Sequence, residues 1–260
     1  MELTLLQNYV MPVSIPLFIL IYALAYTFLF SSWKGNARYE ASSCTMSMLH
    51  GSITALFSAY HLWTTPWKLD AKNTALEDAL MSFSISYFIV DLFHYFLFVP
   101  GDFKFILHHL ATSMYMISCK YYTKHGGLSV IALMGLGEVS SPLQSMWTIS
   151  RFGQKVSPVA KAFYESSSLP FTLLFTVTRG FLGPILTWNL CSFYLSNRAG
   201  HVIPYWIATF WMALVIIGMS GSLMWLRSLW VGLQRFNAKK KNMGSSSSSI
   251  TLKLNGIKHK

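Results

Sequence analysis

Two adjacent histidines, His108 and His109, lie within an otherwise apolar stretch at 105–117, and the preceding apolar stretch carries Asp91 and His94. A charged side chain at the centre of a membrane helix costs roughly 2.5–3.5 kcal/mol, so such groups usually face a protein interior, a water-filled path or a site. Imidazole titrates near neutral pH and serves as general base, general acid, nucleophile or metal ligand. We therefore expect the histidine pair to mark the functional site.

Other polar residues are spaced to share this interior. Tyr87, Asp91 and His94 follow one another at i, i+4 and i+7, which places them on one stripe of a helix, where Asp91 can orient His94. Taken alone, this stripe is better explained as a hydrogen-bonded layer that fixes helix packing. Thr112 follows the histidine pair by one turn, so its hydroxyl lies between the two imidazoles.

A second carboxylate stands beside a predicted helix break. Glu138 and Ser141 precede Pro142, and a proline inside a helix leaves a backbone carbonyl unpaired one turn earlier. At membrane depth such breaks occur where the backbone is buried in protein or lines a cavity. We therefore take Glu138 and Ser141 as candidate cavity residues, together with His50 and Arg179, two ionisable residues in other apolar stretches.

Metal binding is the weaker interpretation of these residues. No histidine pair with four-residue spacing lies on one predicted helix, as a typical zinc site would require. The three cysteines are far apart and lack the short paired spacings of metal or disulfide frameworks. We expect no metal, and we interpret the cysteines as packed thiols.

The composition is that of a membrane protein. The chain has 260 residues, of which 53% are hydrophobic and 11% charged, and its mean hydropathy is +0.43, which excludes an ordinary soluble globule. A membrane helix needs about 20 apolar residues. We predict an all-α, polytopic fold of about seven transmembrane helices that enclose a polar-lined cavity, near 11–30, 45–62, 78–99, 105–122, 127–149, 162–194 and 204–232. Prolines and a glycine in the sixth could divide it into two pieces.

The net charge of +11 belongs largely to the C-terminal end, because seven of the twenty Lys and Arg lie in residues 235–260. We expect no nucleic-acid partner. The basic tail either anchors the topology or attracts anionic lipid headgroups, and the first interpretation is favoured. Lysine and arginine counts on alternate sides predict a cytoplasmic C-terminus, and five consecutive serines predict a disordered tail.

Together these motifs resemble the TLC-domain family, the membrane module shared by the translocating-chain-associating protein, ceramide synthases and a set of smaller lipid-related proteins. The segments 86–91, 108–112 and 137–142 carry the resemblance in order and spacing, and His50 fits the family's upstream histidine position. The resemblance covers roughly residues 40–230. It divides the chain into a first helix with a basic loop (1–39), a TLC-like membrane domain (40–234) and the tail (235–260).

The resemblance implies six or seven helices around a cavity that is open to lipid, a lipid chain as its occupant, and residence in the endoplasmic reticulum or a related membrane. In ceramide synthases the paired-histidine segment belongs to the acyl-transfer site, so His108 and His109 are the matching residues here. Those enzymes continue with a His-Asp pair and a further aspartate, whereas here Glu138 is the acidic residue of that stretch. This departure favours the smaller branch with a Glu-x-Ser-x-Pro signature.

Three functions stay open at this point. The first is lipid handling in membrane lipid homeostasis, with membrane lipids as partners and no cofactor. The second is a ceramide-synthase-like N-acyltransferase with acyl-coenzyme A as co-substrate, in which His108 or His109 takes the amine proton, Asp91 orients an imidazole, and Glu138 or Arg179 balances charge. The third, a proton or ion path, is the least favoured because no inverted repeat is visible. The sequence does not define an oligomeric state.

Overall fold

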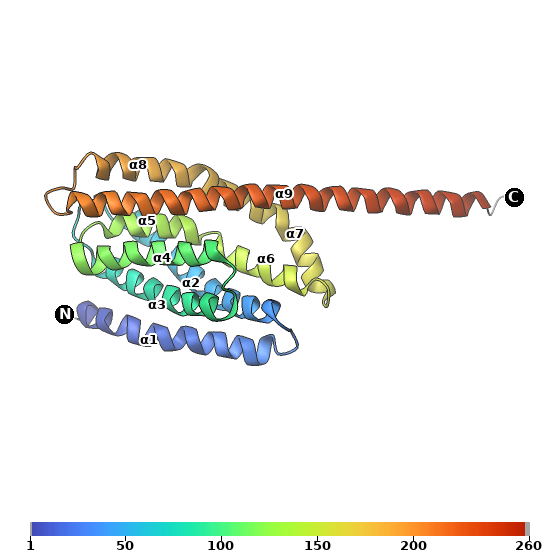
Figure 1. Cartoon of the computed structure of the whole chain (residues 1–260), viewed down its shortest axis with the longest axis horizontal. Coiled ribbons are helices and arrows are strands. Elements are labelled where there is room, and N and C mark those ends of the chain that lie inside the picture. The colour runs from blue at the N-terminus through green and yellow to red at the C-terminus, as the bar shows by residue number, and fades with distance from the viewer. Residues whose placement is uncertain (1, 258–260) are drawn as a thin grey trace.

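A computed structural model describes the backbone of residues 2–257 and the side chains of residues 8–238. Within this part every extended regular element is a helix, and the one β-type contact is an isolated bridge between Lys72 and His125. Most helices lie side by side along one axis, and α9 extends well beyond the others toward the C-terminus (Figure 1). The prediction of an all-α, polytopic membrane protein is confirmed.

Each predicted span corresponds to a helix or to consecutive helical segments. In the described residues the order is α1 (Glu2–Leu24), η1 (Ala25–Leu29), α2 (Asn36–Thr64), α3 (Ala75–Phe98), α4 (Phe103–Ile117), η2 (Ser118–Thr123), α5 (Gly127–Glu138), α6 (Ser141–Gly153), α7 (Pro158–Phe175), η3 (Thr176–Leu182), α8 (Gly183–Leu195) and α9 (Tyr205–Ile257), where η marks a π-helical segment.

Four segments of the described chain are long and apolar enough to cross a membrane by themselves, namely Asn8–Leu29, Ala75–Phe98, Pro158–Leu195 and Tyr205–Ala238. The helix α2 is long enough but more polar, with a buried histidine at each of positions 50 and 61. It packs against α1, α3, α5 and α6. A helix surrounded by protein does not need an apolar surface on every side, which explains why α2 tolerates these polar residues.

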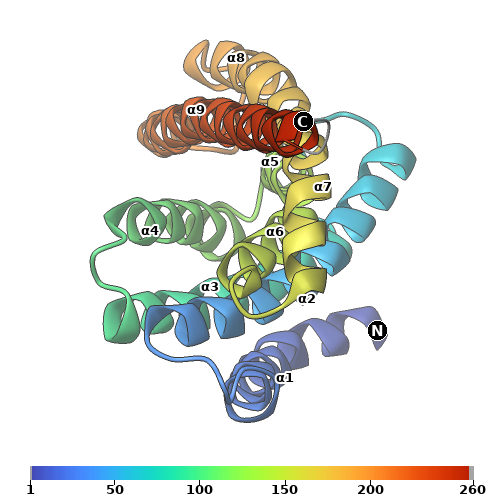
Figure 2. The same cartoon turned by 90° about the vertical axis from the view of Figure 1, so that its right-hand side faces the viewer.

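End-on, the bundle has α1 on one side, α8 and α9 on the opposite side, and α2–α6 between them (Figure 2). One apolar core connects these layers, with fully buried side chains such as Phe18 from α1, Met81 from α3, Ile131 from α5 and Trp211 from α9. The polar residues of the candidate site therefore lie inside a packed bundle rather than on its lipid-facing rim.

Local sequence signals explain where two of the helices begin. The Thr74 side chain accepts a hydrogen bond from the Glu77 backbone N–H, while the Glu77 carboxylate accepts one from the Thr74 N–H. This capping box satisfies two backbone donors at the start of α3. The helix α7 starts in a related way, because the Ser157 hydroxyl accepts from the Ala160 N–H and Pro158 occupies the first turn.

The predicted break beside Glu138 is confirmed. The helix α5 ends at Glu138 and α6 begins at Ser141, with Pro142 in the first turn, where its missing N–H leaves no intrahelical bond unmade. Gly51 of α2 faces this break. A Cβ atom at Gly51 would lie 2.8 Å from the Ser141 Cβ and 3.0 Å from the Glu138 Oε2, so the glycine permits the close approach of α2.

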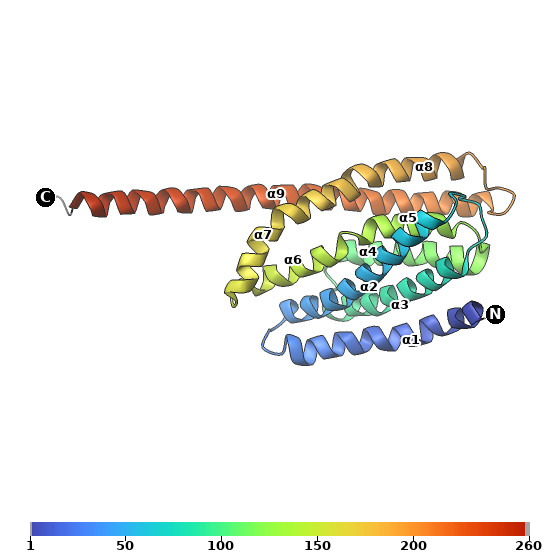
Figure 3. The same ribbon diagram turned by 180° about the vertical axis from the view of Figure 1, so that it is seen from behind.

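The sixth predicted span is one continuous helical segment rather than two separate helices. The segment α7–η3–α8 bends, so that α7 leans across the end of the bundle while α8 runs beside α9 (Figure 3). The π-helical turns of η3 surround Arg179, and Pro184 lies in the first turn of α8. Such π-helical insertions often occur at functional sites because they redirect side chains locally.

The tail differs from the prediction of a disordered segment from Arg235 onward. The helix α9 continues to Ile257. Its membrane-spanning part is already a nucleated helix, so each further residue adds a backbone hydrogen bond without the cost of a new nucleus. The side chains of 239–260 and the backbone of 258–260 lie outside the described residues.

Candidate functional site

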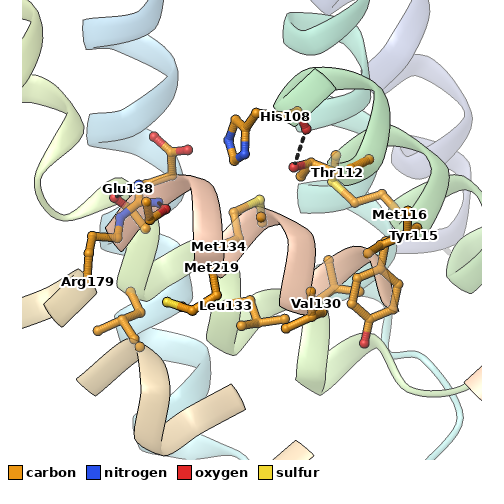
Figure 4. Close-up of a pocket in the computed structure, with 18 of the residues that line it drawn as sticks. His108, Thr112, Tyr115, Met116, Val130, Leu133, Met134, Glu138, Arg179 and Met219 are labelled. Atoms are coloured by element: carbon orange, nitrogen blue, oxygen red, sulfur yellow. Dashed lines mark hydrogen bonds between the residues drawn. The ribbon is translucent and has the colours of Figure 1, made fainter. Parts of the chain in front are cut away.

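A cavity of ≈ 110 Å³ lies between α3, α4, α5, η3, α8 and α9. Most of its wall is apolar, with Val130 and Leu133 from α5 and Met219 from α9 among the lining residues. His108, Glu138 and Arg179 converge at the other end, as Figure 4 shows. The cavity is therefore amphipathic, with a long apolar wall and one ionisable end.

His108 presents its side chain to this cavity. The residue is half-buried, and among the described residues its imidazole makes no hydrogen bond. The Thr112 hydroxyl, which we expected between the two imidazoles, instead donates to the backbone carbonyl of His108 over 2.8 Å (Figure 4). A helix offers this carbonyl to a threonine one turn later, so the local bond prevails. The His108 ring is left available to a ligand.

His109 points away from the cavity into a buried cluster. Its Nδ1 lies 2.8 Å from the Phe105 carbonyl oxygen, and its Nε2 lies 2.8 Å from Oδ2 of Asp91. A carbonyl oxygen only accepts, so Nδ1 carries a hydrogen and donates it. One further proton is then shared between Nε2 and the carboxyl group. Both nitrogens of His109 are thus engaged within the protein.

Asp91 is held by donors from three helices. Ser43 of α2 donates to Oδ1 over 2.5 Å, and Tyr87 donates to Oδ2 over 3.1 Å, beside the contact with His109 of α4. Two hydroxyl donors stabilise the carboxylate form, so the proton shared with His109 lies on the imidazole and the two residues form an ion pair.

The prediction that Asp91 orients His94 is wrong. Asp91 contacts α2 and α4, whereas the Nδ1 of His94 lies 3.1 Å from the Tyr22 hydroxyl of α1. The two residues share a helix stripe, yet the partners on neighbouring helices determine what each one bonds. Their spacing along α3 could not reveal those partners.

His50 forms a second acid–base contact, behind the cavity wall. Ser84 donates to the Met134 sulfur over 2.9 Å, so it accepts from the Nε2–H of His50, 3.0 Å away. The Nδ1 of His50 is then left as a lone pair, 3.8 Å from Oε2 of Glu138. Two acceptors repel each other, so this contact is favourable when one of the two groups carries a proton.

Arg179 reaches the cavity from η3. Its Nη2 donates to the Gly137 carbonyl over 2.8 Å, and its Nη1 donates to the Ser222 hydroxyl over 3.4 Å. Its Nε is buried without a hydrogen-bond partner among the described residues. Arg179 forms no ion pair with Glu138, which lines the same cavity. Neutral oxygen atoms therefore hold the guanidinium, and its charge is not paired directly.

The structure separates the predicted site residues into two groups. Those that line the cavity are His108, Thr112, Glu138 and Arg179. Those placed behind or away from its wall, contrary to their expected place on it, are His50, Tyr87, Asp91, His94, His109 and Ser141. Of the three residues expected to be catalytic, only His108 can touch a cavity ligand directly.

Sequence reasoning missed several polar partners. Ser43, which donates to Asp91, lies just before the predicted start of its helix at residue 45, while the structure begins that helix at Asn36. The spacing of Ser84 and Ser222 along the sequence does not indicate that they contact His50 and Arg179. Within the described part of the chain, no group of three or more His, Cys, Asp or Glu side chains is arranged to hold a metal ion.

Fold and site together define a polytopic helical membrane protein with an amphipathic cavity inside its bundle. The family model of the TLC domain matches residues 40–233. A TLC domain-containing protein of Arabidopsis thaliana is 35% identical over 235 residues, which cover 89% of this chain and 92% of that protein. The chain belongs to the TLC domain family, and the resemblance of its motifs is confirmed.

Proposed function

We propose that this protein binds a membrane lipid in the cavity and acts in membrane lipid homeostasis. The observation that carries the proposal is the amphipathic wall, in which an apolar surface ends at His108, Glu138 and Arg179. Ligand sites are typically apolar pockets with a few polar groups that fix orientation. A lipid matches this arrangement, with its chain along the apolar wall and its polar group at the ionisable end.

The polar end would decide which lipid binds. A lipid tail is already in an apolar medium in the bilayer, so its transfer into the cavity gains little from the hydrophobic effect. Hydrogen bonds and charge at His108, Glu138 and Arg179 act at membrane depth, where an unpaired polar group is costly. Selectivity therefore depends on the head group more than on the chain.

We further propose residence in the endoplasmic reticulum or a related membrane, with a cytoplasmic C-terminus. The basic residues concentrated at 235–260 support this orientation, since positively charged segments beside a membrane span favour the cytoplasmic side. Protease protection of a C-terminal epitope in intact microsomes tests it, and a protected epitope would reverse the orientation.

Lipid profiling tests the proposed function. We expect cells that lack the protein and cells that carry His108→Ala to show the same altered lipid profile. The matched control is His201→Ala, because His201 is 63% exposed in its side chain and lies outside the cavity wall. Unchanged profiles in the first two cell lines would refute a role in lipid homeostasis.

The availability of His108 supports a second candidate, an N-acyltransferase. The nitrogen of a sphingoid base would attack the acyl-coenzyme A thioester, His108 would accept the amine proton, and the departing thiolate would take up a proton, giving amide and free coenzyme A. His109 cannot take this role while both of its nitrogens are engaged. Purified protein should then form amide, and no product at any acyl length would eliminate this candidate.

A further inference from the structure

The polar interior contains two contacts between a carboxyl group and an imidazole. Asp91 and His109 form the first, an ion pair with no net charge. Glu138 and His50 form the second, in which the His50 Nδ1 lies 3.8 Å from the Glu138 Oε2, beyond hydrogen-bond distance, and has no hydrogen-bond partner among the described residues. Both contacts follow from the donors and acceptors that surround each imidazole.

Arg179 adds a positive charge that forms no direct ion pair with Glu138, the carboxylate of the same cavity. A guanidinium group stays protonated in proteins. Its bonded partners, the Gly137 carbonyl and the Ser222 hydroxyl, are neutral, and its buried Nε has no partner among the described residues. A buried cation with an unbonded donor and no direct ionic partner is costly at membrane depth, which makes this end of the cavity a favourable place for an anion.

Resting on the proposed function, we propose that the cavity selects lipids with an anionic head group, whose carboxylate or phosphate oxygens bind Arg179. The guanidinium presents several N–H donors in a rigid fork that suits such oxygens. His108 stands at the same end with a ring that bonds no described residue, so its N–H is available as a further donor. From this end the cavity wall continues into apolar residues of α5 and α9, which suit the adjoining part of a lipid chain.

The local packing keeps Arg179 at this place. A Cβ atom at Gly137 would lie 3.1 Å from its Nη2, so the glycine leaves room for the guanidinium beside α5. The Phe175 ring lies beneath it, 5.5 Å from the guanidinium carbon. A cationic head group would be repelled by the fixed positive charge of Arg179.

Binding of head groups that differ in charge tests the assignment. Full-length protein in nanodiscs of zwitterionic lipid is titrated with a fatty acid, a fatty alcohol and a fatty amine of equal chain length, and with a lysophosphatidate, and bound probe is measured by native mass spectrometry. We expect an anionic probe to bind at least tenfold tighter than the alcohol, and the amine to bind more weakly still. The carboxylate and phosphate probes identify which anion is preferred.

Variants locate the effect. Arg179→Gln should remove the tenfold preference for the anionic probe over the alcohol, and Arg179→Lys should keep part of it. The matched control is Arg227→Gln, since Arg227 is exposed on α9 and absent from the cavity wall. The Lys variant and the wild-type probe series remain informative if Arg179→Gln does not fold.

Three outcomes would contradict the assignment. Equal binding of all probes, or a preference for the amine that Glu138→Gln abolishes, would overturn the anionic site but leave lipid binding in place. A preference for anions that persists in Arg179→Gln would also overturn it. Binding of none of the probes would overturn both this assignment and the proposed lipid binding.

Discussion

Alanine substitution of the two adjacent histidines should affect two different properties, the stability of the fold and the binding of lipid. His109 is buried and bonded at both nitrogens, while His108 is half-buried and lines the cavity without a hydrogen bond from its ring to a described residue. We therefore expect His109→Ala to destabilise the fold and His108→Ala to leave it nearly intact while reducing lipid binding.

The structure gives the size of this contrast. Removal of His109 leaves the Asp91 carboxylate buried without its cation, and breaking a buried ion pair in this way typically costs about 3–5 kcal/mol. If the Asp91–His109 contact were an ordinary interhelical hydrogen bond, its loss would cost only about 0.6 kcal/mol, the average found for such bonds in a membrane protein. Truncation of His108 removes no hydrogen bond of its ring, and we expect it to lower the free energy of unfolding by about 1 kcal/mol or less.

The free energy of unfolding is measured for the full chain by titration with SDS in mixed micelles, followed by circular dichroism. The double variant Asp91→Ala with His109→Ala should be less destabilised than the sum of the two single variants, because it leaves no orphaned charge. Equal losses for His108→Ala and His109→Ala, or additive losses in the double variant, would refute the division of roles within the pair.

Three further substitutions test the open space of the cavity, the packing at the helix break and the cap of α3. Gly218 lines the cavity, and a Cβ atom there would meet no atom within 4 Å, so Gly218→Leu should fold normally yet lower lipid binding at least tenfold. Gly221 is equally open but lies outside the cavity wall, so Gly221→Leu should not lower lipid binding. Equal lipid binding by the two variants would contradict this. Gly51→Ala should destabilise by about 1–3 kcal/mol through overpacking against the helix break, whereas Gly101→Ala, in open space, should be neutral in the same unfolding assay. Thr74→Ala should cost about 1 kcal/mol by removing the cap of α3 without changing lipid binding, and a loss of binding would contradict a purely structural role.

Local sequence signals were sufficient to predict the helices and the break at Glu138. Runs of apolar residues located the spans, and Pro142 located the start of α6. Both features depend on residues within one or two turns of each other. The tail was a different case, since its serine-rich composition predicted disorder while α9 continues as a helix to Ile257.

The site depends on rotations and long-range partners that spacing alone does not contain. Adjacent residues of a helix point about 100° apart, so the sequence implied that His108 and His109 diverge but not which one meets the cavity. His61 illustrates the same limit. A histidine in the last turn of a helix is typical of a membrane interface, yet the His61 Nε2 lies 2.9 Å from the buried carboxylate of Glu77 on the next helix.

The central claim, that a lipid chain occupies the cavity, is tested most directly by photolabelling. A lipid with a diazirine in its chain is activated in membranes that contain the full-length protein, and labelled residues are mapped by peptide mass spectrometry. Met116 lines the cavity but is fully buried, whereas Leu107 is 40% exposed on the outer face of α4. We predict labelling of Met116 as well as of Leu107. Labels confined to exposed residues such as Leu107 would contradict the claim.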